Sequence, residues 1–257
     1  MSRSIRVASG CVIALCLGCW PSSSQPAAKK KPAPTPAPAC GIHCGTERWD
    51  IKTLSDAHAK DINFTPAPSS VDKLSKITAP TSGATRNASE KQTYSVRAKL
   101  VGYKIEFNPK PKAGSTPGDH DFHIVLQDLN GPATMVVEIP DVQCSGVCSS
   151  IKKAEIEKVR SDFQSGVTTP PAEGFFTLAN PVEVEVTGVA FFDFAHGQTG
   201  LAPNCIELHP VLSFTFASKP TAASDPSKEP KKHPSAFYHC LPAVHAGGAP
   251  KAAKGTD

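Results

Sequence analysis

Two stretches of the sequence gather the polar side chains that could do chemistry. Residues 119–123 read "DHDFH", and residues 191–210 read "FFDFAHGQTGLAPNCIELHP". Histidine nitrogens and carboxylate oxygens bind Zn²⁺ and other divalent ions, and the same groups serve as general acids and bases. With one glutamate from a third stretch, the candidate ligand-binding or metal-ligating residues are Asp121, His123, Glu138, Asp193, His196, Gln198, Glu207 and His209.

The spacing of these residues matches no established catalytic motif. The sequence contains no HExxH, GxSxG or P-loop pattern, so no catalytic residue is assigned. Alternation along an extended chain places Asp121 and His123 on one strand face, and Glu207 and His209 on another. A simpler interpretation is that these are solvated side chains at strand ends, with Asp193 capping its loop and the neighbouring histidine bonding to backbone. We favour that interpretation over a metal site.

Three segments in the middle of the chain alternate apolar and polar side chains, which is typical of half-buried strands. They are residues 93–107, 121–128 and 133–140. Gly102 interrupts the first segment and predicts a bulge. In the second segment, Phe122 and Ile124 lie on the face opposite to His123.

The pattern changes to a helical one after the third strand. Residues 149–163 mix charged and apolar side chains at helical spacing, with serine as the expected N-cap. Two more strands are predicted at residues 180–194 and 205–216, and Pro210 indicates a bulge or an edge in the last of them.

The resulting order is strand, strand, strand, helix, strand, strand. It matches the OB-fold, a five-stranded Greek-key barrel with one helix between strands 3 and 4. We therefore predict a mainly β protein with an OB-fold-like barrel over residues 93–217. An N-terminal extension with short helices covers residues 40–92, including a helix near residues 71–77. In an OB-fold, the loops at residues 108–120 and 193–204 would flank the ligand face.

The N-terminus has the pattern of a secretory signal. Basic residues precede a short apolar run that ends in small residues, and we assign the signal to residues 1–18. The sequence "LCLGC" at residues 15–19 resembles a bacterial lipobox, although Cys16 stands where that motif prefers leucine. Cys19 is therefore a candidate for lipidation, with simple secretion as the alternative.

Two low-complexity segments flank the predicted domains. Residues 19–39 form an Ala/Pro/Lys-rich spacer, and residues 218–257 form a Lys/Pro/Ala-rich tail that we expect to be disordered. These features predict an exported protein of the periplasm, the outer membrane as a lipoprotein, or the extracellular space. Its membrane contact would come from the lipid anchor.

Six cysteines remain outside the signal, and an even number in an exported chain favours disulfides. They are Cys40, Cys44, Cys144, Cys148, Cys205 and Cys240. In "CGIHC" and "CSGVC" three residues separate the cysteines, whereas zinc knuckles more often have two, so we favour disulfides over zinc. One arrangement pairs the cysteines within each of these motifs and joins the last two. The sequence leaves the connectivity open.

The charge of the chain is unevenly distributed. The whole chain carries +4, but the segment from Cys40 to Phe216 has 16 Lys and Arg against 20 Asp and Glu, a net charge of −4. Nucleic-acid-binding domains usually have a basic surface. We therefore do not expect the acidic core to bind nucleic acid.

The chain also contains the stretches "WDIKTLSD", "DFHIVLQD", "MVVEIPD", "GVAFFDFAHGQTG" and "APNCIELHPV". Over residues 47–216 they resemble an uncharacterised family of exported bacterial proteins with the motif HGQTG-x-APN-x-IELHPV. The resemblance implies an OB-like barrel and no known activity. That family usually has glycine where this chain has Cys205, which implies that a negative φ suits this position and that a disulfide has been added.

These observations favour a non-catalytic binding module of the cell envelope, with an envelope component or a glycan as its ligand, because OB-folds bind oligosaccharides. This interpretation requires no cofactor. One alternative is a metal-dependent hydrolase, phosphodiesterase-like or nuclease-like, that uses the His/carboxylate set with a divalent ion. The other alternative is a structural protein of envelope assembly.

Overall fold

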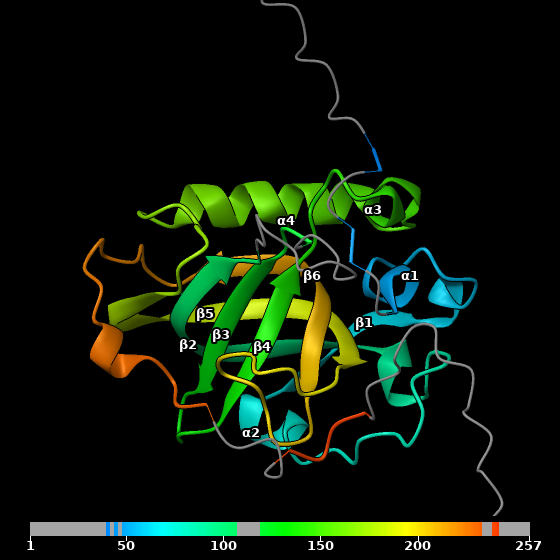
Figure 1. Cartoon of the computed structure of the whole chain (residues 1–257), viewed down its shortest axis with the longest axis horizontal. Coiled ribbons are helices and arrows are strands. Elements are labelled where there is room, and N and C mark those ends of the chain that lie inside the picture. Colours follow the sequence, from blue (N-terminus) through cyan, green and yellow to red (C-terminus); the bar gives the residue numbers. More distant parts are fainter. Residues whose placement is uncertain (1–39, 42–43, 46–47, 107–118, 233–237, 242–257) are drawn as a thin grey trace, which may run out of the picture. The chain divides into compact units, whose positions relative to one another are not determined.

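Six β-strands pair into one sheet that closes into a ring (Figure 1). The computed structural model describes residues 40–41, 44–45, 48–106, 119–232 and 238–241. The strands, in their order around the sheet, are β1 (Asn63–Ser69), β2 (Gln92–Ile105), β3 (Phe122–Asp128), β4 (Thr134–Ile139), β6 (Ile206–Phe216) and β5 (Phe176–Phe192). β5 pairs back onto β2 and closes the ring. The protein is mainly β, as the alternation predicted.

The five predicted strands correspond to β2 through β6, and both predicted irregularities are present. The β2 register shifts between Leu100 and Gly102 against both β3 and β5. The register between β5 and β6 shifts around Gly188, opposite the segment that contains Pro210. β4 and β6 run parallel, whereas β2–β3, β3–β4, β5–β6 and β2–β5 are antiparallel.

The strand β1 was not predicted. It contains Pro66 and Pro68, which lack the N–H that a central strand must donate. β1 pairs in parallel with β2, and it lies at the end of the strand order. Prolines are tolerated at such an edge.

The main apolar core lies inside the ring, between two helices at opposite ends of the strands (Figure 1). α4 (Lys153–Gly166) buries Ile156, Val159, Arg160 and Phe163, which follow helical spacing. It begins after the predicted start because residues 145–149 form a separate short helix, α3 (Ser145–Ser149). At the other end, α2 (Val71–Leu74) buries both of its terminal residues.

The N-terminal extension contains the expected short helices. They are α1 (Trp49–Lys52), η1 (Ala59–Asp61), α2 and η2 (Ser89–Lys91). Arg48, just before α1, forms two hydrogen bonds with Glu90 and one with the Phe192 carbonyl. The extension is therefore fastened to the end of β5.

The disulfides join the two CxxxC motifs to each other. The structure pairs Cys40 with Cys148 and Cys44 with Cys144, so pairing within each motif is wrong. α3 carries Cys148 and follows Cys144, and both cysteines lie beside the chain that leads into α1. The third pair, Cys205–Cys240, is the expected one.

The negative φ expected at position 205 is wrong. Cys205 has φ = 56° and lies in the left-handed region. Glycine adopts this conformation without steric cost, whereas a side chain with a Cβ does so at a cost. The glycine preference inferred from the resemblance is consistent with this geometry.

The described part of the C-terminal tail differs from the disorder that we expected. Ser224 bridges to Leu178, residues 226–228 form η3 (Pro226–Lys228), and Leu241 is buried in the core. These contacts and the Cys205 disulfide attach a low-complexity sequence to the ring. The signal, Cys19 and the spacer lie outside the described residues. Among the residues described, no helix combines the length and the hydropathy needed to cross a membrane.

Candidate functional site

The polar candidates meet on the outer face of the ring. Core residues such as Phe122, Val137 and Leu208 point inward, so the alternate positions point outward. His123 pairs in register with Glu138 across β3 and β4. Val136 pairs with Glu207 across β4 and β6, which places that glutamate beside Glu138 on the same face. The side chains are brought together by strand pairing, because β3, β4 and β6 are neighbours.

Glu138 lies between the two histidines. Its Oε1 atom is 3.0 Å from His123 Nδ1, and its Oε2 atom is 3.1 Å from His209 Nδ1. Glu106 also approaches His123 Nδ1, at 3.4 Å. The other nitrogen of His123 lies 2.9 Å from the Thr199 carbonyl, to which it donates a hydrogen bond. Glu138 therefore joins the two imidazoles into one network.

His209 is surrounded by carboxylates. Glu207 Oε1 is 3.3 Å from its Nδ1 atom, and Asp121 Oδ2 is 3.3 Å from its Nε2 atom. The Asp121 Oδ1 atom accepts a hydrogen bond from the backbone of Asp141. His209, Asp121 and Glu207 are at most 1% exposed, so the expectation of solvated strand-end residues is wrong for this cluster.

Asp193, His196 and Gln198 extend the network along the loop after β5. Asp193 accepts a hydrogen bond from the Phe194 N–H, which is the expected local cap. Gln198 donates to Asp193 at 3.4 Å and accepts from the His196 backbone N–H. The His196 ring lies 3.5 Å from Asp193 and is 41% exposed. All eight predicted candidates therefore belong to one connected group, which has His196 at its rim.

The helix α1 covers this cluster and adds residues that sequence reasoning missed. The Lys52 ammonium lies 3.6 Å from Asp193 and 3.9 Å from Glu138. The Trp49 ring makes an edge contact with His209, with ring centroids 6.1 Å apart. Neither residue carries a pattern that identifies it, since both lie about 70 or more residues before the cluster and reach it only through the tertiary fold.

In the basic side chains of the cluster, nearby carboxylates raise the pKa more than burial lowers it. Burial acts to lower the pKa of Lys52, but the carboxylates of Asp193 and Glu138 raise it well above its usual range. Burial likewise acts to lower the pKa of His209, but its three carboxylate neighbours raise it well above the ordinary value. Both groups are therefore favoured in their charged forms by fixed negative partners.

The carboxylates of the cluster differ in the direction of their pKa shifts. Burial acts to raise the pKa of Glu138, but hydrogen bonds from His123 and His209 hold it well below its usual range. Burial raises the pKa of Glu207 to about 7, aided by the charge of Glu138. Burial also raises the pKa of Asp119 to about 9. Glu138 is thus held in its ionised form, whereas burial favours the protonated forms of Glu207 and Asp119.

Two triads among the described residues place their donor atoms close enough to hold one metal ion each. The first consists of Glu106, His123 and Glu138, and the second of Asp121, Glu138 and His209. Within each triad the ligand atoms lie within 4.8 Å of one another. Glu138 is shared, so the two triads overlap.

No model of a protein family matches the chain, and no curated protein matches its sequence. Among solved structures, the chain is similar to a putative aspartyl-tRNA synthetase from Leishmania major Friedlin, with 14% identity and a TM-score of 0.35. The match covers 63% of this chain and 22% of that chain. The chain thus spans about a fifth of the length of that protein.

Proposed function

We propose that this chain is an exported cell-envelope protein whose ring of strands is an OB-type barrel that binds a ligand without transforming it. The strand pairing supports the OB assignment. β2, β3 and β4 form a meander, α4 follows, and β6 inserts between β4 and β5 with a parallel β4–β6 pair. We take this connectivity as support for a five-stranded Greek-key barrel with one helix after its third strand.

One observation favours binding over catalysis. Among the described residues, the side chains that could act as acid, base or metal ligand in this cluster are mostly out of reach of solvent. His123, Glu138, Glu207 and His209 are all at most 4% exposed, beneath α1. A hydrolase acting on an external substrate needs its acid, its base or its metal-bound water to reach the reacting atoms. The arrangement supports a structural role for the cluster.

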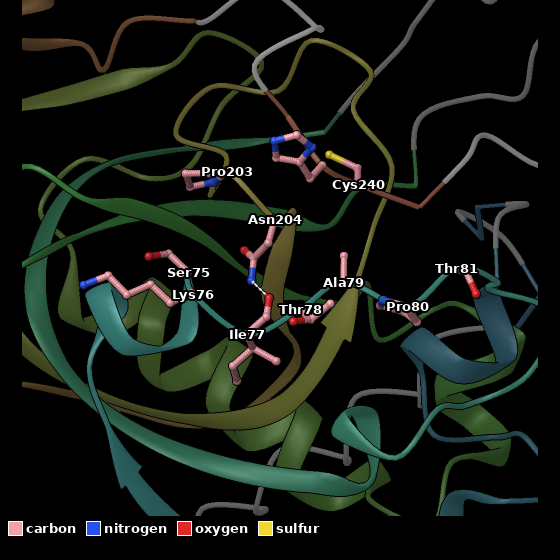
Figure 2. A pocket seen from close by; sticks show the side chains of 11 residues that line it. Ser75, Lys76, Ile77, Thr78, Ala79, Pro80, Thr81, Pro203, Asn204 and Cys240 are labelled. Carbon is pink, nitrogen blue, oxygen red and sulfur yellow. Dashed lines mark hydrogen bonds between the residues drawn. The ribbon is translucent and has the colours of Figure 1, made fainter.

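An open groove lies elsewhere, beside α2 (Figure 2). It has a volume of about 590 Å³, which is within the range of small-molecule sites. Asn204 forms part of its wall and donates hydrogen bonds to the carbonyls of Leu74 and Ile77, at 2.9 and 2.7 Å. Figure 2 shows the bond to Ile77. These bonds and the Cys205–Cys240 disulfide hold the groove in shape.

The lining of the groove suits a hydroxyl-rich or anionic ligand. Beside apolar side chains such as Ile77 and Pro203, it includes the hydroxyls of Ser75, Thr78 and Thr81, the Lys76 ammonium and the His239 ring, and among the described residues no Asp or Glu lines it. A cell-wall glycan offers hydroxyls and carboxylates that complement these groups. We therefore propose an envelope glycan as the ligand.

The test is a titration of isotope-labelled protein with soluble glycan fragments from bacterial cell walls, followed by NMR. We expect shifts at the groove residues and at least about tenfold weaker binding in Thr78→Trp, equivalent to about 1.4 kcal/mol. Thr65→Trp, an equally exposed threonine on β1, is the matched control and should bind as the unaltered protein does. An absence of shifts at millimolar glycan, or equal affinity in the two variants, would refute this function.

Export is supported by the three disulfides, because such bonds persist in oxidising compartments. We propose the periplasm, the outer membrane through lipidated Cys19, or the extracellular space as the location. Mass spectrometry of the mature N-terminus distinguishes the lipoprotein from the secreted form.

A metal-dependent hydrolase is the second candidate, favoured by the two triads of metal-binding type. It requires α1 to move away so that substrate can reach the cluster. Phosphodiester hydrolysis that depends on added metal, and that stops when α1 is locked in place, would support it over the binding module.

A further inference from the structure

Two fully buried polar atoms in the cluster have no hydrogen-bond partner among the described residues. They are the Oδ2 atom of Asp121 and the Nε2 atom of His209. They face each other at 3.3 Å, close enough for electrostatic attraction, but their angles do not suit a hydrogen bond. A buried polar group without a partner costs about 1–3 kcal/mol, and more when it is charged. Both atoms therefore point to a further ligand between them.

The separation of these atoms is the one that a tetrahedral metal imposes. Zn²⁺ binds imidazole nitrogen and carboxylate oxygen at about 2.0–2.2 Å, so two of its ligands lie about 3.3 Å apart. Glu138 completes a triad with these two residues, in which each residue can place one donor atom within 4.8 Å of the others. Two oxygens and one imidazole nitrogen are a ligand set of the kind that binds Zn²⁺.

The surroundings of His209 prepare its Nε2 atom for a metal. Glu138 Oε2 and Glu207 Oε1 lie 3.1 and 3.3 Å from Nδ1, so Glu207 can accept the proton on that atom when Glu138 binds the metal. Without a metal the surrounding carboxylates favour a second proton on this ring, and a metal ion at Nε2 would displace that proton and take the lone pair directed toward Asp121. Metal-binding histidines usually donate their second ring N–H to a carboxylate or a carbonyl, which fixes the tautomer and the ring orientation.

Charge balance favours a cation in the same place. Four carboxylates of the cluster are at most 4% exposed: Asp121, Glu138, Asp193 and Glu207. Among the described residues, Lys52 is the permanently charged side chain that forms ion pairs within 4 Å of this set. The guanidinium of Arg160 instead donates hydrogen bonds to the carbonyls of His120 and Ile139. A divalent ion that displaces the proton from His209 therefore replaces the positive charge that the ring otherwise supplies to these carboxylates.

We propose that Asp121, Glu138 and His209 bind one divalent transition-metal ion of the Zn²⁺ type, in a buried site beneath α1. Three protein ligands leave a fourth coordination position for water. Because Trp49 packs against the His209 ring, metal binding also stabilises α1 on the outer face of the ring. This inference is independent of the glycan groove.

The test measures metal content and affinity in the full mature chain, purified without a polyhistidine tag. We expect one equivalent of Zn²⁺ by elemental analysis, and uptake of one equivalent after chelator treatment, with a higher Tm that depends on Zn²⁺ concentration. Asp121→Asn and His209→Gln should each weaken binding at least about 100-fold. His58→Gln, at an exposed histidine that pairs with Asp61, is the matched control and should retain one equivalent.

Two further measurements exclude binding by the tail or by the cysteines. The tail carries His233, His239 and His245, and a variant that lacks all three should retain its equivalent of metal. X-ray absorption on the unaltered zinc-bound protein should show one imidazole and oxygen ligands without sulfur, which needs no variant to fold. No zinc uptake by the unaltered chain, sulfur ligation, or binding unaffected by His209→Gln would each overturn the proposal.

A metal ion bound by the other triad, Glu106, His123 and Glu138, would respond to substitutions in the opposite way. His123→Gln should keep one equivalent with about 10–100-fold lower affinity, because His123 only orients Glu138. Complete loss of metal in His123→Gln, with full retention in Asp121→Asn, would assign the ion to Glu106, His123 and Glu138 and refute our assignment.

Discussion

The guanidinium of Arg48 forms two hydrogen bonds with the carboxylate of Glu90, at 2.6 and 2.7 Å, and the Glu90 side chain is fully buried. Glu90 also accepts hydrogen bonds from the backbone N–H groups of Phe192 and Asn87. This single carboxylate therefore connects the residue before α1, the end of β5 and the loop before β2.

We expect Glu90→Gln to lower the free energy of unfolding by about 3 kcal/mol, because it leaves the Arg48 charge without its partner in a poorly solvated site. Glu183→Gln is the control, since Glu183 pairs with Arg97 on the exposed surface of the sheet. That change should cost less than about 1 kcal/mol. Denaturant unfolding measures both values, and similar costs would contradict the importance of the buried pair.

The residues that were predictable from sequence are those whose environment is set by local alternation. Val182, Val184 and Val186 recur at every second position in β5, and the helical spacing of Ile156, Val159 and Phe163 locates α4. Such periodicity reports which face is buried whatever the partner is. The strand members of the candidate cluster lie together for the same reason, since Asp121, His123, Glu138, Glu207 and His209 alternate with core residues.

Features that depend on distant partners were not predictable. Lys52 is an ordinary lysine in sequence, and its role arises from Asp193 and Glu138, which lie 80 or more residues later. The pairing of the CxxxC motifs depends on where α3 lies. β1 was missed because its two prolines exclude a central strand and leave only an edge position, which local sequence does not distinguish from a loop.

The Cys44–Cys144 disulfide should hold α1 over the polar cluster. It closes a loop of 100 residues, and removing such a bond typically costs about 2–4 kcal/mol. In the double variant Cys44→Ser, Cys144→Ser we expect this loss and faster hydrogen exchange in residues 49–52. Removing Cys205 and Cys240 instead should leave exchange in α1 unchanged. Unchanged exchange in the first variant would show that the remaining Cys40–Cys148 disulfide and the Arg48–Glu90 pair position the helix without this bond.

Asp128 should make stability depend on pH in the acid range. Burial acts to raise its pKa, but hydrogen bonds from the backbone N–H groups of Asp72 and Asn130 lower it below the ordinary value. A carboxylate with a depressed folded-state pKa stabilises the protein above its unfolded pKa, about 4, and this contribution is lost as the pH falls through the folded value.

The variant Asp128→Asn isolates this contribution. It retains one acceptor oxygen and should lower the free energy of unfolding at pH 7 by about 1–3 kcal/mol. The difference from the unaltered protein should shrink as unfolding is measured below about pH 4. Asp162→Asn, on the exposed face of α4, serves as the control with a small effect. A difference that stays constant from pH 7 to pH 3 would contradict the assignment.

Gly200 should tolerate no side chain, because it combines a φ of +82° with a close approach to β3. A Cβ at this position would collide with the side chain of Val125. The residue before it, Thr199, supplies the carbonyl that accepts a hydrogen bond from His123. We expect Gly200→Ala to cost about 2–4 kcal/mol, from the left-handed backbone and from overpacking.

Gly131→Ala is the matched control, because a Cβ there meets nothing within 4 Å. It should change stability by less than about 1 kcal/mol. If Gly200→Ala also displaces the Thr199 carbonyl, the hydrogen exchange of the β3 amides and the His123 ring resonances will change in that variant alone. Equal stability of the two variants would mean that the loop moves away from β3 at little cost, and the carbonyl would then not hold His123 in place.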